Sequence, residues 1–300
     1  MNLVQVFQKF PTQESCIAHL EMVKWNNKPT CPYCNAQQSS IMSGRHHCNR
    51  CNTSFSVTVG TIFHHTHLPI QKWFLAITLV LNAKKGISSR QLARDIEVTK
   101  DTAWRVQMQI RQAMIEAPSL MTGIVEMDET YIGARKPRKE SKDKDENGNY
   151  PKNPRGRGTK IKTPVAGAVQ RGGKVFAKMQ SALKFADLKK TAKELIDFDN
   201  AVLIADDYRG YIPFKNLIKH ETVNHSHKEY ARGQSHTNTI EGFCSLLKRG
   251  IIGQYHYLND KHLNKYILEF CYKYNNREPS VGVSQNANVF NNLLSNAVSL

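Results

Sequence analysis

Acidic residues in three separate stretches could together hold a divalent cation. They lie at Asp128-Glu129 in a predicted strand, at Asp206-Asp207 after an apolar strand, and at Glu241 early in a predicted helix. Carboxylates gathered in one place repel one another unless a cation lies among them, and hard oxygen ligands select Mg²⁺ or Mn²⁺. Two such ions about 4 Å apart can hold the attacking and leaving oxygens of a phosphodiester in line. These residues therefore predict metal-assisted phosphodiester chemistry.

A lysine follows Glu241 on the same side of the predicted helix. In HTNTIEGFCSLLKRG, residues 236–250, the seven-residue step from Glu241 to Lys248 is almost two helical turns, so both side chains project the same way. Asn238 three residues before Glu241 also fits a capping box, in which Asn caps the helix and Glu bonds back to the Asn amide. His236 could contact phosphate or be structural. The apolar face would comprise Ile240, Phe243, Cys244 and Leu247.

Four cysteines predict a zinc site. Cys31 and Cys34 form one CxxC pair, and thirteen residues later, after positions 35–47, Cys48 and Cys51 form another. Four thiolates in two tight turns close a tetrahedral zinc site, and so small a segment needs a metal in order to fold. A redox pair is the competing interpretation. We expect the nearby histidines to be surface or DNA-facing residues: His46, His47, His64, His65 and His67.

Residues 87–116 predict a helix pair of the helix-turn-helix type. The break falls near Glu97-Val98, with Ser88 or Ser89 and Thr99 as helix caps. Glu97 stands where a turn glycine is often found, which weakens the match, and an ordinary helical hairpin is the alternative. The apolar positions that would pack are Leu92, Ala93, Ile96, Ala103, Val106 and Ile110. The basic positions left exposed would be Arg90, Arg94, Lys100 and Arg105.

The remaining elements indicate a mixed α/β organisation. TSFSVTVGTIF, residues 53–63, alternates like a strand, and residues 68–86 indicate a helix that opens near Pro69 and ends at Gly86. Farther along come a hairpin at Gly172-Gly173, a helix near residues 185–198, and the apolar strand AVLIA before Asp206. The interval 135–163 carries eleven basic and four acidic residues, which predicts a mobile or partner-ordered loop.

The overall charge predicts a polyanionic partner. Against 25 Asp and Glu there are 42 Lys and Arg, giving a formal charge of +17 and a pI near 9.6, which favours nucleic acid over membrane. We find no 18-residue apolar run and no leader with a cleavage site, so we expect neither export nor membrane insertion. Three single cysteines in apolar settings, Cys16, Cys244 and Cys271, favour a reducing cytosol.

Longer motifs carry a resemblance to a known family. VEMDETYIG, GRGTKIKTPVAGAVQRGGKV, ADDYRGY, HTNTIEGFCSLLKRGIIGQYHYL and LNKYILEFCYKYNNR follow CPYC and CNRC, and together they resemble ISXO2-like (IS1595) transposases of bacterial insertion sequences. The 34 residues between Asp206 and Glu241, positions 207–240, and the downstream Lys248 resemble the acid triad and lysine of DDE transposases. The resemblance implies Asp128 and Asp206 as metal ligands, Glu241 or Asn238 as the third, and Lys248 as a DNA contact.

The resemblance also implies an organisation and an activity. We expect a zinc ribbon at 1–62, a helix-turn-helix-like DNA-binding segment at 63–121, a ribonuclease H-like α/β catalytic core at 122–275, and a C-terminal tail at 276–300. The protein would recognise the terminal repeats of an insertion sequence, cut and join DNA with Mg²⁺ or Mn²⁺, and work as a dimer or higher assembly near the bacterial nucleoid in the cytoplasm. A non-catalytic DNA-binding regulator and a nuclease that never joins strands are the alternatives.

Overall fold

The computed structural model describes residues 1–37, 39–42, 45–133, 162–223, 235–256, 258–277 and 286–299. These residues divide into two compact units. Unit 1 comprises residues 1–115 and 276–300, and unit 2 comprises residues 116–275. The basic loop predicted at 135–163 lies outside the described residues, apart from positions 162 and 163. None of the described helices combines the length and apolar composition needed to cross a membrane.

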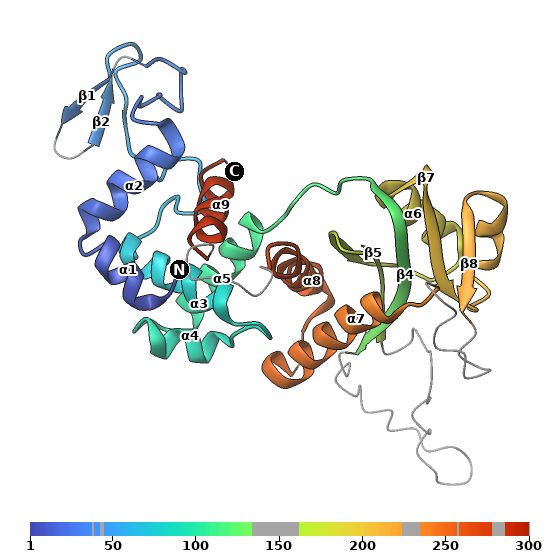
Figure 1. Ribbon diagram of the computed structural model, residues 1–300. Helices are drawn as coiled ribbons and strands as arrows, with labels where there is room; N and C mark the ends of the chain where they lie inside the picture. Colours follow the sequence, from blue (N-terminus) through green and yellow to red (C-terminus); the bar gives the residue numbers. More distant parts are fainter. Residues whose placement is uncertain are drawn as a thin grey trace, which may run out of the picture. The chain divides into compact units, whose positions relative to one another are not determined.

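Unit 1 contains a small three-stranded sheet and a set of helices (Figure 1). The sheet has strand order β1-β2-β3 and is antiparallel throughout. Its strands are β1 (Ser39–Met42), β2 (Arg45–Cys48) and β3 (Ser54–Phe55), and the helices are α1 (Leu3–Lys9), α2 (Gln13–Trp25), α3 (Ile70–Asn82), α4 (Ser89–Asp95), α5 (Lys100–Ala113) and α9 (Asn286–Val298). The strand expected over residues 53–63 is thus wrong beyond Phe55, because the chain turns there and reaches a left-handed φ of 68° at Gly60.

The final helix packs into the N-terminal helices of unit 1. Phe290 of α9 is 1% exposed, and its ring centroid lies 5.5 Å from that of Phe74 in α3. Phe10, which follows α1, meets Phe74 at 4.9 Å. A backbone bond of 3.1 Å from Ile62 to Ala297 adds to this packing. The residues predicted as a C-terminal tail therefore include a helix whose apolar side is buried in unit 1.

The helix pair begins and breaks at the predicted residues. Ser88 and Thr99 cap α4 and α5, each accepting a hydrogen bond from a backbone N–H three residues on. Between the helices Glu97 adopts a left-handed φ of 53°, the conformation that glycine adopts most easily. Lys72 of α3 donates a 3.1 Å bond to the Glu97 carbonyl oxygen. The glycine-like turn thus forms with a glutamate, supported by a lysine from another helix.

Unit 2 is built on a mixed five-stranded sheet with order β6-β5-β4-β7-β8. The pairs β4·β5 and β5·β6 are antiparallel, and β4·β7 and β7·β8 are parallel. This confirms the mixed sheet flanked by helices expected for a ribonuclease H-like core. Its elements are β4 (Met121–Gly133), β5 (Lys162–Gln170), β6 (Val175–Met179), α6 (Phe185–Leu195), β7 (Ile196–Asp206), the 3₁₀ helix η1 (Ile212–Asn216), β8 (Lys219–Val223), α7 (Asn238–Gly250), the π-helical turn η3 (Ile251–Tyr255) and α8 (Asp260–Asn275).

Alternation along β4 separates the apolar core from the polar site. Val125 and Met127 are fully buried with residues of α6 such as Leu188, whereas Glu126 and Asp128 project to the other face, where α7 packs. Gly167 of β5 lies in register with Asp128. A Cβ atom at Gly167 would lie 3.2 Å from Cδ1 of Ile240. The glycine therefore allows α7 to approach the sheet closely beside Asp128.

Candidate active site and zinc centre

The four predicted zinc ligands come together in unit 1. The Sγ atoms of Cys31, Cys34, Cys48 and Cys51 all lie within 4.8 Å of one another. Sγ of Cys31 is 3.6 Å from Sγ of Cys51, and Sγ of Cys34 is 3.5 Å from Sγ of Cys48. Tetrahedral zinc with bonds of about 2.3 Å places its sulfur ligands about 3.8 Å apart. The cluster therefore fits a structural zinc ion.

The two halves of the cluster share one backbone design. Asn35 and Asn52 each follow a CxxC pair, and each adopts a left-handed φ, 57° and 55° respectively. Each donates its backbone N–H to the carbonyl oxygen of the first cysteine of its pair, Cys31 or Cys48, at 2.9 Å. Backbone N–H groups of Cys51 and Arg50 help lower the pKa of Cys48 to about 6, which favours the thiolate that binds metal.

One of the histidines expected at the surface lies in the core of the ribbon instead. His46 is 7% exposed, and its Nε2 atom is 2.8 Å from Oε1 of Glu21 in α2. Its ring stacks on Phe55 at 5.4 Å and meets Trp25 edge-on at 5.2 Å. The prediction of a surface or DNA-facing role was therefore wrong for His46, because the ribbon needs this ring for packing.

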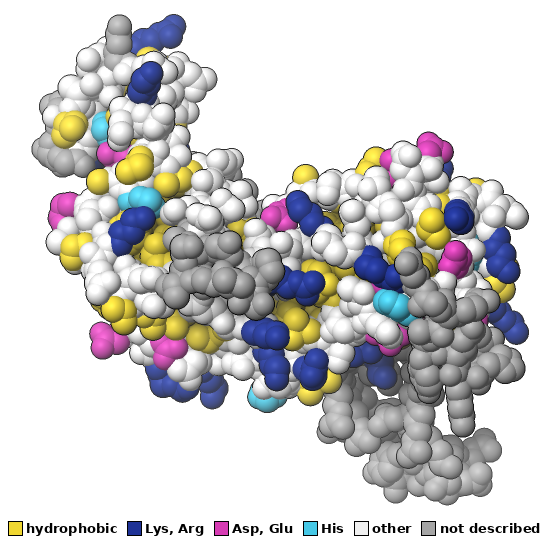
Figure 2. Space-filling model, viewed as in Figure 1, with side chains coloured by type: hydrophobic (Ala, Val, Ile, Leu, Met, Phe, Trp, Pro, Cys, Tyr) yellow, Lys and Arg dark blue, Asp and Glu magenta, His cyan; other side chains and the backbone are white. Residues whose placement is uncertain are grey.

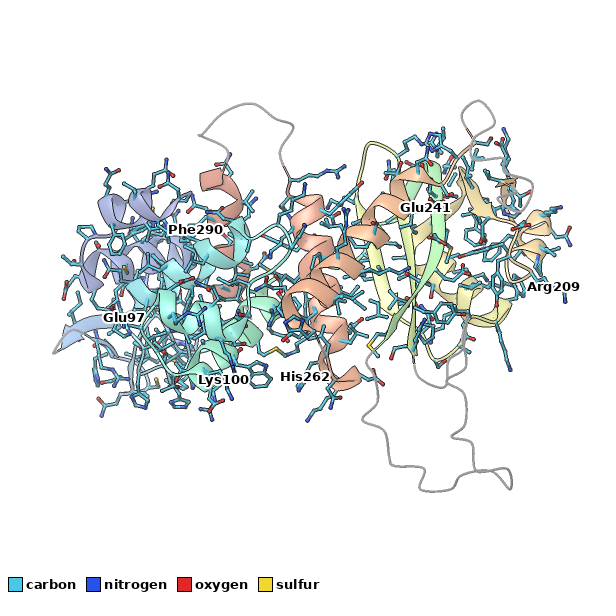
Figure 3. The ribbon with its side chains drawn as sticks, turned by 90° about the horizontal axis from the view of Figure 1, so that it is seen from below. Glu97, Lys100, Arg209, Glu241, His262 and Phe290 are labelled. Carbon is cyan, nitrogen blue, oxygen red and sulfur yellow. The ribbon has the colours of Figure 1, made fainter. Side chains whose placement is uncertain are left out.

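Basic side chains decorate the helix pair as predicted. The four expected positions, Arg90, Arg94, Lys100 and Arg105, are all exposed. Figure 2 shows Lys and Arg side chains gathered on the viewed face near α4, and Figure 3 places Lys100 at the start of α5, close to the Glu97 turn. The exposed aromatic Trp104, at 38%, lies among them. Positive charge with an aromatic ring suits contact with a nucleic acid.

The carboxylates of unit 2 gather where β4 and β7 lie side by side. The register pairs Glu126 with Ile204, and extending it by two residues places Asp128 beside Asp206. Carboxylate oxygens of Asp128, Asp206 and Glu129 lie within 4.8 Å of one another. Burial raises the pKa of Asp128 to about 7, and the negative charges of Asp206 and Glu241 add to the rise. Such a cluster is the setting in which a divalent cation is favourable.

Two backbone groups hold the paired aspartates, and two further side chains complete their surroundings. The N–H of Glu129 donates to Asp128 at 2.8 Å, and the N–H of Tyr208 donates to Asp206 at 3.1 Å. Glu129, 9% exposed, is the third member of the cluster. Tyr211 is fully buried, and burial together with the carboxylates of Glu129, Asp128 and Asp206 raises the pKa of its hydroxyl.

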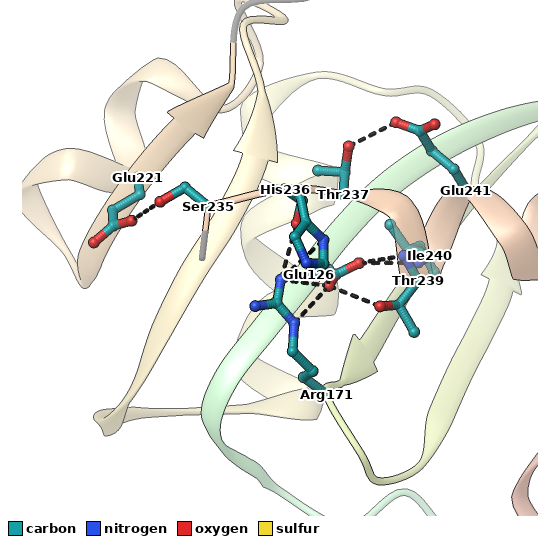
Figure 4. Close-up of polar contacts among 9 residues, drawn as sticks. All are labelled: Glu126, Arg171, Glu221, Ser235, His236, Thr237, Thr239, Ile240 and Glu241. Carbon is teal, nitrogen blue, oxygen red and sulfur yellow. Dashed lines mark hydrogen bonds and ion pairs between the residues drawn. The ribbon is translucent and has the colours of Figure 1, made fainter. Parts of the chain in front are cut away.

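Helix α7 brings Glu241 and Lys248 toward the aspartates without a capping box. The helix begins at Asn238, the cap residue is Thr237, and Asn238 is exposed within the first turn. Glu241 instead accepts a 2.6 Å hydrogen bond from the Thr237 hydroxyl (Figure 4). The capping-box interpretation is therefore wrong. Glu241 lies outside the group within 4.8 Å, yet Glu241 and Lys248 both act on the pKa of Asp128, the first raising and the second lowering it.

The two units together define a class of protein. A zinc ribbon with a basic helix pair suits DNA contact, and acidic groups on a ribonuclease H-like sheet suit metal-dependent action on phosphodiesters. The class is therefore that of DDE-type nucleases and transposases.

Family comparison identifies the group within this class. Residues 120–275 match the family described as "ISXO2-like transposase domain", and residues 11–54 match the one described as "Transposase zinc-ribbon domain". The first match covers 156 of the 300 residues, so the chain belongs to the ISXO2-like transposase family. It is a DNA transposase, as the sequence motifs predicted, and the regulator and nuclease alternatives are not favoured.

Other proteins resemble the chain to different degrees. A protein of Halobacterium salinarum named "Uncharacterized protein in transposable element ISH50" is 29% identical over 248 residues, covering 77% of this chain and 80% of that protein. The structure of a pre-cleavage Mos1 transpososome contains a chain that is 12% identical to this one, with a TM-score of 0.21. The match covers 68% of this chain and 79% of the Mos1 chain. The structure of a Mos1 strand transfer complex matches 69% of this chain and 79% of the Mos1 chain, at 13% identity and a TM-score of 0.22. Similarity this low adds nothing to the assignment.

Proposed function

We propose that this transposase cuts DNA at the ends of its element with Asp128, Asp206 and Glu241 as metal ligands and then joins the ends to target DNA. The observation that carries the proposal is the side-by-side placement of Asp128 and Asp206, with Glu241 close enough to raise the pKa of Asp128. Hydrolysis would free a 3′-hydroxyl at each end. That hydroxyl would attack a target phosphodiester and release one target strand end, without a covalent enzyme intermediate.

The chain's own groups suit this chemistry. Two divalent cations, Mg²⁺ or Mn²⁺, would supply Lewis-acid stabilisation of the attacking and leaving oxygens. Asp128 and Asp206, held by backbone N–H groups, would keep their carboxylates in fixed positions. The Thr237 hydroxyl would orient Glu241. Lys248, exposed on the same helix, would hold a phosphate of the DNA backbone as a compact point charge.

Glu241 is the third ligand that we propose, and Asn238 is its rival. The carboxylate of Glu241 helps raise the pKa of Asp128, which supports a position facing the cluster. Asn238 is the first residue of α7 and, like Glu241, is exposed. Figure 3 shows Glu241 on α7 beside the strands of the sheet.

Unit 1 would recognise the terminal repeats. The zinc ribbon and the basic helix pair supply the positive charge and the exposed aromatic ring for DNA contact, and the basic interval 135–163 would cover phosphates in a salt-dependent way. Because two DNA ends must be brought together, at least two copies of the chain would assemble on them.

The test is Mn²⁺-dependent cleavage and strand transfer on DNA that carries the element's own ends. Wild type is compared with Asp128→Ala, Asp206→Ala, Asn238→Ala and Glu241→Ala. We expect the wild type to join strands and Asn238→Ala to stay active. Cleavage by Asp128→Ala, Asp206→Ala and Glu241→Ala should fall by at least about a thousandfold. If Asn238→Ala is inactive and Glu241→Ala is active, Asn238 rather than Glu241 is the third ligand. Equal DNA binding by all five proteins without any cutting would overturn the catalytic proposal.

A further inference from the structure

The start of α7 is held by a buried carboxylate on β4. Glu126 lies two residues before Asp128, so both side chains project from the same face of the strand. The Glu126 side chain is fully buried. It accepts bonds from Arg171, at 3.0 Å from Nε and 2.7 Å from Nη2, and from the Thr239 hydroxyl at 2.9 Å. It also accepts from the backbone N–H groups of Thr239 at 2.8 Å and Ile240 at 3.1 Å (Figure 4).

These bonds replace a helix cap that α7 lacks. The first N–H groups of a helix have no partner within the helix and carry partial positive charge, so they favour a nearby carboxylate. Thr237, the cap residue, makes no capping bond through its side chain. Glu126 supplies the acceptor from another element, and charged acceptors make stronger hydrogen bonds than neutral ones. The first turn of α7 is therefore bonded directly to the strand that carries Asp128.

The segment entering α7 is held at further points. Nη2 of Arg171 also donates to the backbone carbonyl oxygen of His236 at 3.1 Å, and Nδ1 of His236 lies 3.5 Å from Glu126. Ser235 bonds to Glu221 of β8 through their side chains. His236 thus belongs to a structural network, as one of its two predicted roles required. The whole entry to the helix is held against the sheet.

The Glu126 side chain connects the parts of the fold that carry two proposed metal ligands, Asp128 on β4 and Glu241 on α7. Glu126 is two residues from Asp128 along β4, and the groups that it binds, Thr239 and Ile240, are two and one residues from Glu241. A change in the length or strength of these bonds would move the start of α7 relative to β4. The distance between Asp128 and Glu241 would then change.

We propose that Glu126 is a positioning residue for the metal site, setting where Glu241 stands relative to Asp128. The inference rests on the proposed function only in taking Asp128 and Glu241 as ligands. Supporting groups of this kind commonly change metal affinity by 10- to 100-fold when altered. Glu126 differs from a merely stabilising buried ion pair in one respect. Its removal should weaken metal binding as well as lower the melting temperature.

The test compares Glu126→Gln with a matched control, Glu269→Gln. Glu269 of α8 is also fully buried and paired, with Lys273 at 2.5 Å, and it lies on another element than Asp128 and Glu241. Binding of Mn²⁺ to each full-length protein is followed by electron paramagnetic resonance of the free ion. We expect about tenfold weaker Mn²⁺ binding in Glu126→Gln and unchanged binding in Glu269→Gln, although both melt at lower temperature.

A second comparison shows whether Glu126 acts through Glu241. In a Glu241→Ala background, Glu126→Gln should weaken Mn²⁺ binding by less than twofold further, because the ligand that it positions is already gone. Additive losses would overturn the proposal, as would wild-type Mn²⁺ affinity in Glu126→Gln. If Glu126→Gln does not fold, Thr239→Val removes only the hydroxyl bond to Glu126 and should weaken binding about twofold.

Failure of the proposed function gives a different result. A wild-type protein that binds Mn²⁺ with the Glu126 dependence described, but neither cuts nor joins DNA, would refute the catalytic proposal and support the positioning role. A wild-type protein with no Mn²⁺ binding would overturn both.

Discussion

The cysteine cluster and the acid cluster bring their side chains together in opposite ways. The four cysteines lie within 21 residues of sequence, positions 31–51, and local backbone turns set their geometry. The carboxylates of Asp128, Glu129 and Asp206 come from β4 and β7. Burial raises the pKa of Asp128, and the negative charges of Asp206 and of Glu241 in α7 add to the rise. A closed structural site can therefore be built from local sequence, whereas a site with room for substrate is assembled by the whole fold and retains electrostatic repulsion.

Breaking the acid cluster should have the largest effect and should leave the zinc centre intact. We expect Asp206→Ala to reduce strand cleavage by at least about a thousandfold, because a ligand at the phosphodiester is removed. Zinc content measured by mass spectrometry should stay at one ion per chain. Asp207→Ala is the control, since Asp207 is exposed and outside the cluster. Equal losses in the two variants would contradict the assignment of Asp206.

Breaking the zinc centre should spare the other site. Cys48→Ser should abolish zinc binding and unfold the ribbon, because its small core is built around the buried Cys31 and Cys48 and depends on the metal. Affinity for terminal-repeat DNA, measured by fluorescence anisotropy, should fall by at least about tenfold, as phosphate contacts are lost. Mn²⁺ binding should be unchanged. Cys16→Ala provides the control, because Cys16 is buried away from the cluster, and zinc loss in that protein would undermine the interpretation.

The burial of Asp128 among other carboxylates predicts a dependence of stability on pH. Because the folded-state pKa of Asp128 is raised to about 7, the folded protein binds this proton more tightly than the unfolded chain does. Metal-free stability should therefore fall as the pH rises from about 4 to about 7. At pH 8, Asp128→Asn should melt a few degrees above wild type. At pH 4, the two proteins should have the same melting temperature. Asp199→Asn, at an exposed position, should show no such gain.

The smallest effect is expected at the turn of the helix pair in unit 1. Glu97 occupies a left-handed conformation that costs a non-glycine residue about 1 kcal/mol. Glu97→Gly should therefore stabilise unit 1 by about 0.5–1 kcal/mol in thermal unfolding and leave cleavage unchanged. Glu97→Ala keeps the backbone strain and should show no comparable gain. Equal stabilisation by both substitutions would show that the glutamate side chain, rather than the backbone, is unfavourable.

Local patterns in the sequence predicted local structure well. The CxxC pairs, the caps Ser88 and Thr99, and the hairpin at Gly172-Gly173 need only neighbouring residues, and the structure contains all of them. The helix expected over 185–198 was too long, because Ile196 already pairs in β7. Strand pairing, which depends on distant residues, ended the helix earlier than the local pattern indicated.

Residues that act across elements could not be found in this way. Glu126 lies two residues before Asp128, but no motif shows that its carboxylate bonds to α7 rather than joining the acid cluster. Arg171 sits beside a turn, where an exposed role is the usual expectation, and its partner Glu126 is 45 residues away. His46 lies near four cysteines and packs in the ribbon core. In each case, the role of the residue depends on a contact that only the folded structure shows.

Because the chain returns to unit 1 after unit 2, the helices of unit 1 are not all translated before unit 2 is. A ribosome completes every strand of the five-stranded sheet, together with α7 and α8, before residues 286–298 exist. Helices α2, α3 and α5 emerge first, yet their apolar surfaces stay uncovered until α9 packs against them. A stop codon between residues 276 and 286 would leave the whole of unit 2 translated and the helices of unit 1 incompletely packed. A chain that stops there would thus lose packing in unit 1 while keeping every residue of the acid cluster in unit 2.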